Sequence, residues 1–132
     1  MPTIPGSLSG IQTALYSGSL QLIEVVEFYI AQIKDNQHLN AFNAVFEEEA
    51  ISKAKEIQLK INNNNVGCLA GLVIGLKDNI AYQNHPLQAS SKILDGFESI
   101  YDSTVTERLI KEDAIIIGSL NCDEFAMGST NE

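Results

Sequence analysis

Two apolar runs constrain the fold of this chain most. Residues 69–76 and residues 114–117 contain no charged side chain. Runs without polar alternation are typical of strands that are buried on both faces of a sheet. Residues 104–112, which come between them, have a helical pattern. This alternation of strands and helices predicts an α/β sheet rather than a β-sandwich.

Lys77 is the charged residue that ends the first run. A lysine can act as a base only where the fold removes its water, because desolvation disfavours the ammonium form. The apolar residues 72–76 and Ile80 could provide that environment. The other interpretation is a solvated lysine at a strand end, since lysines are rarely buried unless paired. The residues alone favour this second interpretation.

Helical patterns cover residues 8–35 and 47–61. Ser9 is a candidate N-cap of the first helix, Gly18 can close it in a left-handed conformation, and Ser19 can cap the next one. Apolar residues recur at helical spacing along the second and third helices, which predicts faces that pack against a partner surface.

Residues 41–46 form a short apolar and aromatic run, which predicts a strand before the third helix. Glu47, Glu48 and Glu49 follow it. A metal site is one interpretation of three adjacent acids. The favoured one is a solvated face, because acidic residues in the first turn stabilise the helix dipole.

Composition limits the possible functions. The 132 residues suit a single domain, and the net charge of -9 argues against direct contact with nucleic-acid phosphates. Cys68 and Cys122 are far apart and suit free thiols in a reducing cytosol. No secretory segment and no run of about 18 apolar residues is present. These features predict a cytoplasmic protein without a membrane segment.

Familiar ligand-binding motifs fail here. Gly71, Gly75 and Lys77 are one residue short of a phosphate-binding loop, and the next residue is an aspartate rather than Ser or Thr. His38 and His85 have no second ligand at zinc-binding spacing. No metal site is therefore predicted.

Residues 125–130, Phe-Ala-Met-Gly-Ser-Thr, form a small-residue segment after the second buried run. Gly128 would let a ligand or another backbone approach closely. A plain connection is the other interpretation, and the residues alone favour it.

Five segments of the chain form an ordered pattern. They are Leu-Ala-Gly-Leu-Val-Ile-Gly-Leu-Lys-Asp-Asn-Ile at 69–80, Ala-Ser-Ser-Lys-Ile-Leu at 89–94, Tyr-Asp-Ser-Thr-Val at 101–105, Ile-Ile-Gly at 116–118 and Asn-Cys-Asp-Glu-Phe-Ala-Met-Gly-Ser-Thr-Asn-Glu at 121–132. In this order and spacing they resemble the amidase signature family. The resemblance covers roughly residues 8–132, about the first quarter to third of a typical member.

The resemblance implies a fold. Residues 1–132 would be the N-terminal part of a single domain, helical over 8–35 and 47–61 with an α/β core over 66–132. These would be the N-terminal helices and the first strands and helices of an α/β/α mixed-sheet fold, incomplete in this chain.

The resemblance also implies a site. Family members are serine amidohydrolases in which an unprotonated lysine, a serine after a cis peptide bond and a nucleophilic serine relay a proton. Lys77 lies at the position of that lysine, and the resemblance implies that Met127, Gly128, Ser129 and Thr130 border the substrate pocket. Both serines belong to a segment that members carry beyond residue 132, so we expect these 132 residues alone to be inactive.

Within the family the chain is most similar to the glutaminase subunits of tRNA-dependent amidotransferases. That similarity implies glutamine as substrate, subunits B and C as partners, and tRNA reached only through the complex. ATP and magnesium are expected on a partner subunit, and no cofactor is expected in this chain. Two alternatives stay open: an amidase acting on other small amides, and a non-catalytic binding module.

Overall fold

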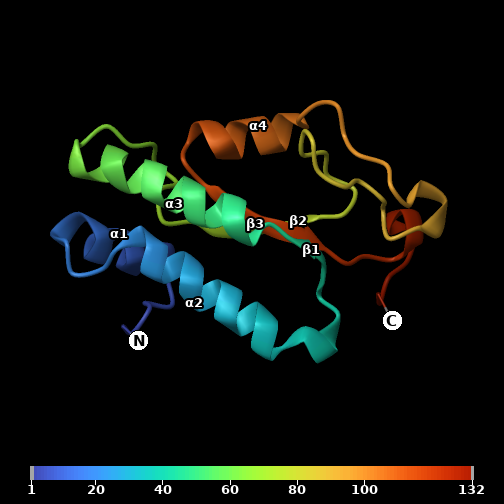
Figure 1. The fold of residues 1–132 in the computed structure, drawn as a ribbon, viewed down its shortest axis with the longest axis horizontal. Helices are drawn as coiled ribbons and strands as arrows, with labels where there is room; N and C mark the ends of the chain where they lie inside the picture. Colours follow the sequence, from blue (N-terminus) through green and yellow to red (C-terminus); the bar gives the residue numbers. More distant parts are fainter. Residues whose placement is uncertain (1, 132) are drawn as a thin grey trace.

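The computed structural model describes residues 2–131, which form four α-helices, three strands and three short 3-10 turns (Figure 1). The helices are α1 (Leu8–Ser17), α2 (Leu22–Asp35), α3 (Glu47–Asn62) and α4 (Thr104–Lys111). The strands are β1 (Phe42–Val45), β2 (Val73–Lys77) and β3 (Ile115–Leu120). The 3-10 turns are Gln37–Leu39, Lys92–Leu94 and Glu124–Ala126.

The three strands form a mixed sheet with β3 in the middle. Strand β1 pairs with β3 antiparallel, and β2 pairs with β3 parallel. The predicted α/β fold class is confirmed. Because β2 and β3 are parallel, their carboxyl ends meet at one edge of the sheet, where Lys77 is in register with Leu120.

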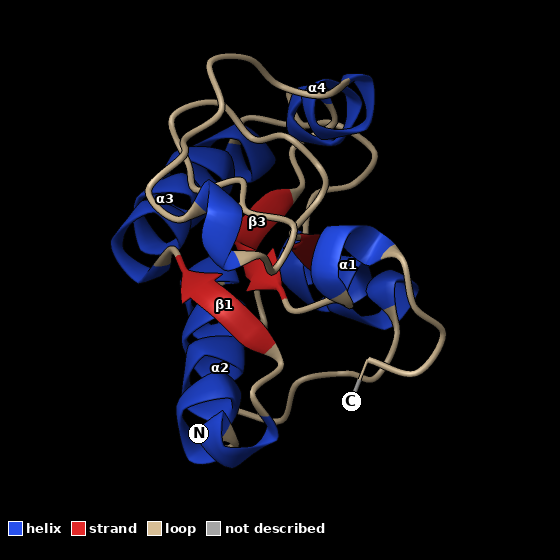
Figure 2. Ribbon diagram, turned by 90° about the vertical axis from the view of Figure 1, so that its right-hand side faces the viewer, coloured by secondary structure: helices blue, strands red, loops and turns tan. Residues whose placement is uncertain are grey.

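One apolar cluster joins the helices to the sheet. Figure 2 shows α1, α2 and α3 arranged around the strands. The buried side chains of this cluster are Ile11, Leu15, Leu20, Leu22, Val25, Val26, Ile30, Ala50, Ala54, Ile57, Ile61, Ala70, Ile115 and Ile117. The amphipathic faces predicted for the second and third helices therefore pack against each other and against β3. This burial is the main stabilising contribution to the fold.

The helix ends differ in detail from the prediction. Ser7, and not Ser9, caps α1, with its hydroxyl accepting from the N–H of Gly10 at 3.2 Å. Gly18 does close α1 in a left-handed conformation, with φ 78°. Ser19 does not cap α2. The N-cap is Gln21, whose N–H donates to the carboxylate of Glu24 at 2.8 Å.

The first apolar run enters the sheet later than predicted, at Val73 rather than at residue 69. The N–H of Leu72 donates to the carbonyl of Leu69 at 2.9 Å, and Gly71 has φ 95°. This turn satisfies the backbone before the strand begins, and only glycine adopts such a φ without strain. The second run extends beyond the predicted 114–117 and ends at Leu120.

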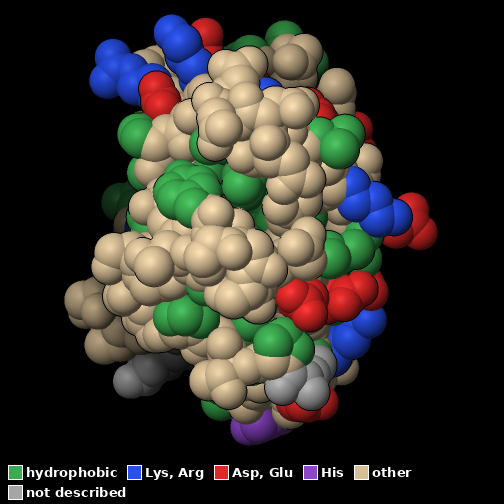
Figure 3. All heavy atoms as spheres, turned by 90° about the vertical axis from the view of Figure 1, so that its left-hand side faces the viewer, with side chains coloured by type: hydrophobic (Ala, Val, Ile, Leu, Met, Phe, Trp, Pro, Cys, Tyr) green, Lys and Arg blue, Asp and Glu red, His purple; other side chains and the backbone are tan. Residues whose placement is uncertain are grey.

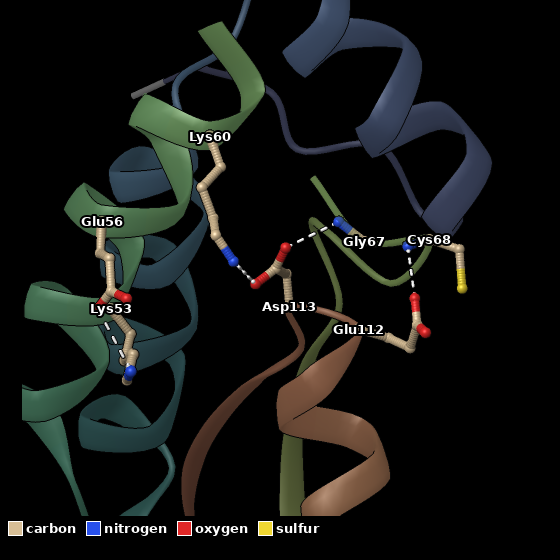
Figure 4. Close-up of polar contacts among 7 residues, drawn as sticks. All are labelled: Lys53, Glu56, Lys60, Gly67, Cys68, Glu112 and Asp113. Carbon is tan, nitrogen blue, oxygen red and sulfur yellow. Dashed lines mark hydrogen bonds and ion pairs between the residues drawn. The ribbon is translucent and has the colours of Figure 1, made fainter. Parts of the chain in front are cut away.

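Polar contacts hold the amino-terminal end of β3 (Figure 4). Asp113 is buried and accepts from the Nζ of Lys60 and from the N–H of Gly67, both at 2.7 Å. The neighbouring Glu112 accepts from the N–H of Cys68 at 3.1 Å. Hydrogen bonding to Glu112 raises the pKa of the exposed Cys68 thiol. These contacts join α3, the loop before β2 and the end of α4.

Charged side chains lie mainly around the rim of the face shown in Figure 3, the left-hand end of Figure 1. Uncharged and hydrophobic side chains occupy its centre. The acidic excess of the sequence is therefore not gathered into one patch on this face. Among residues 2–131, no helix combines the length and the apolar character that crossing a bilayer requires.

Candidate active site

Lys77 is the last residue of β2, at the edge where the parallel strands end. Successive side chains of a strand point to opposite faces. Leu76 and Asp78 are accordingly buried, at 4% and 2% exposure, whereas Lys77 between them is exposed. The apolar flanks do not cover the amine within the described part of the chain, because they lie in line with it along the strand or on the opposite face.

Lys77 shares a hollow of about 270 Å³ with three of the four residues expected at the substrate pocket. Gly128, Ser129 and Thr130 line it. Its other lining residues are Asn121, Cys122, Asp123, Ala126 and Asn131. Met127 does not line it, and its side chain is 86% exposed. The fold thus brings together two segments that are far apart in sequence.

Parallel strand ends explain this position. The loops that follow the carboxyl ends of parallel strands meet in a crevice, which is where open α/β sheets bind ligands. Here the 121–131 segment follows β3, and the 78–91 segment follows β2. Gly128 packs so closely against Asp123 that a Cβ at this position would overlap the Asp123 carboxylate. A larger residue would therefore shift this wall of the hollow.

The side chain of Asp78 is the buried anchor beneath the hollow. Its Oδ1 accepts from the hydroxyl of Ser119 at 2.9 Å and from the N–H of Gln88 at 3.4 Å. Its Oδ2 accepts from the amide of Asn43 at 2.8 Å and from the N–H of Ser90 at 2.9 Å. One carboxylate therefore contacts all three strands or their flanking loops, and every donor to it is neutral.

Ser90 connects Asp78 to residues that line the hollow. Its hydroxyl donates to Asn121 Oδ1 and accepts from the N–H of Cys122, both at 3.0 Å. The amide of Asn43 also donates to it at 3.0 Å. Ser90 and the adjacent Ala89 have φ of 53° and 48°, a left-handed conformation that costs non-glycine residues energy. Such conformations persist where the surroundings hold them, and they cluster at functional sites.

A second polar cluster lies at the start of α3. Tyr82 donates to Glu49 at 2.6 Å, and Nε2 of His85 contacts the same carboxylate at 2.5 Å. The Tyr82 and His85 rings are stacked, with centroids 3.7 Å apart. Burial, followed by the hydrogen bond to Glu49, raises the pKa of Tyr82. Partial burial works to raise the pKa of Glu49, but hydrogen bonds from Tyr82 and His85 outweigh it and lower that pKa.

Sequence reasoning missed parts of both clusters. The solvated-face interpretation does not include the contacts of Glu49, whose side chain is 41% exposed and also binds two side chains of a distant loop. The motif comparison treats Asp78 only as a misfit to a phosphate-binding loop. A signal for it does exist in the sequence, because it comes two residues after a buried strand residue, on the buried side of the alternation. Within residues 2–131, no three His, Cys, Asp or Glu side chains are grouped as metal ligands.

Comparison with known proteins identifies the class. Residues 24–132 match the family model described as Amidase. The chain therefore belongs to the amidase family, which confirms the resemblance seen in the sequence.

Two relatives indicate which members of the amidase family this chain is similar to. The chain is 44% identical over 123 residues to a protein of Chlorobaculum parvum that is named as a subunit of glutamyl-tRNA(Gln) amidotransferase. It is 47% identical over 112 residues to the protein of the same name from Clostridium botulinum. These matches cover 92% and 83% of this chain but only 26% and 23% of the relatives. The chain thus spans about a quarter of their length.

Solved structures agree on the fold. A bacterial aryl acylamidase of the amidase signature family has 27% identity and a TM-score of 0.80, over 90% of this chain and 26% of its own. A peptide amidase from Stenotrophomonas maltophilia has a TM-score of 0.86 over 94% of this chain and 26% of its own. Its identity is 24%, so this second likeness concerns the fold alone.

Proposed function

We propose that this chain is part of the glutaminase subunit of a tRNA-dependent amidotransferase, in which it supplies Lys77 as the base. The observation that carries the proposal is the shared hollow at the carboxyl ends of β2 and β3, which Lys77 lines together with Gly128, Ser129 and Thr130. The names of the relatives support the choice of reaction.

In the proposed reaction, a nucleophilic serine attacks the side-chain amide of glutamine. A second serine, preceded by a cis peptide bond, passes the nucleophile's proton to Lys77. The proton then passes from Lys77 to the leaving nitrogen, the C–N bond breaks and ammonia leaves, and water hydrolyses the acyl-enzyme to release glutamate. Gly128, Ser129 and Thr130 form one wall of the glutamine pocket, and Met127 borders it from outside.

Neither relay serine is assigned to residues 2–131. The hydroxyl hydrogen of Ser90 is engaged by Asn121, and that of Ser91 by Glu124 at 2.7 Å. Neither hydroxyl donates to Lys77, the base of the proposed relay, so neither serine is given the role of the nucleophile or of the bridging serine. We therefore expect the 132 residues alone to release no ammonia.

Lys77 must be uncharged to accept a proton, which requires a drier environment than this segment provides. We propose that the part of the protein corresponding to the unmatched three quarters of the relatives covers this amine. Phe125 and Met127, which are 45% and 86% exposed beside the hollow, would be covered with it.

The proposed setting is a cytoplasmic complex with subunits B and C. The net charge of -9 makes direct contact with tRNA unfavourable, so the partners would hold the tRNA. ATP and magnesium would bind to a partner subunit. The ammonia would convert a misacylated tRNA to Gln-tRNA or Asn-tRNA.

The test is ammonia release from glutamine by the full-length product of the reading frame that contains these residues. We expect Lys77→Ala to lower kcat by about 10³-fold, the range for loss of a general base. Lys77→Arg is the matched variant, because it keeps a long side chain but its guanidinium stays charged and cannot accept the proton, so we expect it to be as inactive as Lys77→Ala. Turnover in Lys77→Ala at the unsubstituted rate would refute the role of Lys77.

Hydrolysis of other small amides is the second candidate, favoured by the likeness to an aryl acylamidase. Assaying the same full-length protein with glutamine and with aryl and aliphatic amides separates the two functions. A kcat/KM higher for an aryl amide than for glutamine would replace the first proposal. No turnover of any amide would favour a non-catalytic binding module.

A further inference from the structure

We propose that Asp78 is a positioning residue, which fixes Lys77 and the 121–131 segment in the geometry that forms the hollow. This inference deepens the proposed function and rests on it for the role of Lys77. It concerns a carboxylate that lies beneath the site and lines no part of the hollow itself.

The contacts of Asp78 match a carboxylate in number and kind. Asp78 is 2% exposed and accepts from Ser119, Gln88, Asn43 and Ser90. A carboxylate has about four acceptor positions and no hydrogen to donate when ionised, so four converging donors match its capacity. A buried charge without such donors would be strongly disfavoured. The surroundings are therefore built around this carboxylate.

Asp78 is connected to Lys77 through the backbone. The two residues are adjacent, and the N–H of Asp78 donates to the carbonyl of Leu120 at 3.0 Å, continuing the β2–β3 pairing. The carbonyl of Asp78 accepts from the N–H of Ala89 at 2.9 Å. Both backbone groups and the side chain of Asp78 are thus held, which fixes the backbone from which Lys77 projects.

Asp78 is also connected to the wall of the hollow through hydrogen bonds. Asp78 holds the N–H of Ser90, and the Ser90 hydroxyl holds Asn121 and Cys122. The carbonyl of Ala89 accepts from the N–H of Phe125 at 2.9 Å. The strained 89–90 segment is thus hydrogen-bonded on one side to Asp78. On the other side it is hydrogen-bonded to residues 121, 122 and 125, which precede the 127–130 segment that borders the hollow. Releasing Asp78 would let this segment relax to ordinary φ values, which would move both attachments.

Cys122 provides a probe of this geometry. It is 6% exposed, lines the hollow, and its Sγ lies 3.4 Å from the Ser90 hydroxyl. An aromatic disulfide reagent can label it only when the segment opens. With Cys68→Ser as background, Cys122 is the single thiol of the chain. Its labelling rate then reports local opening of the loop.

The variants distinguish positioning from general stability. Asp78→Ala removes all four acceptor contacts. Asp78→Asn keeps those to Asn43 and Ser90 through its oxygen and can donate to Ser119, whose hydroxyl rotates to accept. Asp113→Ala is the matched control, because it removes another buried carboxylate with a side-chain donor and a backbone donor, at the opposite end of β3.

We expect Asp78→Ala to speed Cys122 labelling at least about tenfold, and Asp78→Asn less than about threefold, as expected for local opening. Asp113→Ala should leave the rate unchanged. If Asp78→Ala does not fold, Ser90→Ala decides, since it keeps the N–H bond to Asp78, removes the hydroxyl contacts to Asn43, Asn121 and Cys122, and should also speed labelling. The proposal is overturned if neither variant speeds labelling, or if Asp113→Ala speeds it equally, which would indicate global unfolding.

In the full-length protein, Asp78→Ala should lower kcat/KM for glutamine at least about 100-fold, with Asp78→Asn restoring most of it, because misplaced groups lose catalysis steeply. Equal losses in both variants would count against positioning. The labelling result stands whether or not the unsubstituted protein releases ammonia. Failure of the glutaminase assay would therefore count against the proposed function alone.

Discussion

The two ends of the sheet each contain a buried aspartate, and the two aspartates are held differently. Asp113, before β3, is paired with Lys60, whose side chain is 42% exposed. Asp78, after β2, has only neutral donors, although Lys77 is its neighbour in sequence. One end of the fold uses a lysine to neutralise its aspartate. The other end keeps lysine and aspartate on opposite faces, which leaves the amine available at the hollow.

The largest effect is expected from Asp78→Leu. Leucine is close to aspartate in shape but accepts no hydrogen bond, so all four donors to Asp78 would lose their partner. They belong to Asn43, Gln88, Ser90 and Ser119. Buried or partly buried donors without acceptors cost about 1–3 kcal/mol each, whereas the exposed Asn43 can turn to water, and we expect a loss of about 4 kcal/mol in the free energy of unfolding. Urea denaturation followed by circular dichroism measures it. A loss below about 1 kcal/mol would show that neutral donors matter little here.

Asp113→Ala should lower the free energy of unfolding by less, about 2–3 kcal/mol. One of the two donors to Asp113 is a backbone N–H, and the other, Lys60, can turn to water. Part of this cost comes from φ 66° at residue 113, which alanine tolerates less well than aspartate. Asp113→Asn should recover most of the loss, since asparagine accepts this conformation and still binds the N–H of Gly67. The same denaturation experiment ranks the variants, and a larger loss here than at Asp78 would reverse the comparison.

Lys60→Met tests the charged partner itself. The ion pair is partly exposed, and such pairs are worth less than about 1 kcal/mol. We expect a small loss that shrinks further in about 1 M salt, because exposed charges are screened. Asp78→Leu should show no such salt dependence. A Lys60→Met loss that persists in high salt would indicate that packing of the lysine stem dominates.

The smallest expected effect is the pH dependence of the stabilisation by the Lys60–Asp113 ion pair. The hydrogen bond to Asp113 raises the pKa of Lys60 above its ordinary 10.5. A raised pKa means that the stabilisation is fully present below about pH 10.5 and is lost as pH rises through the folded-state value. The stability difference between the unsubstituted chain and Lys60→Met should therefore vanish in that alkaline range. Contacts to Asp78 lack a titrating donor, so the effect of Asp78→Leu should stay constant there.

The secondary structure and the family could be predicted from the sequence, because they depend on the periodicity of apolar residues and on local motifs. The three strands and four helices, the left-handed Gly18 and the membership of the family followed from local patterns and ordered motifs. The late start of β2 could not be predicted, because the turn that ends in Gly71 has the same apolar composition as the strand. The caps at Ser7 and Gln21 were missed because several polar residues compete at each helix start.

The candidate site was predictable only in part. The resemblance supplied Lys77 and the 127–130 segment, and neither their shared hollow nor the exposure of Met127 follows from spacing. The contacts of Asp78 to Asn43 and Ser119 join residues that meet only after the sheet has formed. Tyr82, His85 and Glu49 likewise meet through tertiary packing, which no local pattern encodes.

The order of Lys77 and Asp78 at the end of β2 affects the register in which this strand pairs with β3. A slip of β2 by one residue would exchange the two faces, moving the amine of Lys77 inward among donors and the carboxylate of Asp78 out to water. The first move buries an ammonium among hydrogen-bond donors, and the second leaves those donors without an acceptor. The adjacent pair therefore favours a single register of β2 against β3. After exchange of the two residues, Lys77→Asp with Asp78→Lys, the charged pair would favour one register of β2, while every other side chain of the strand would favour the original one.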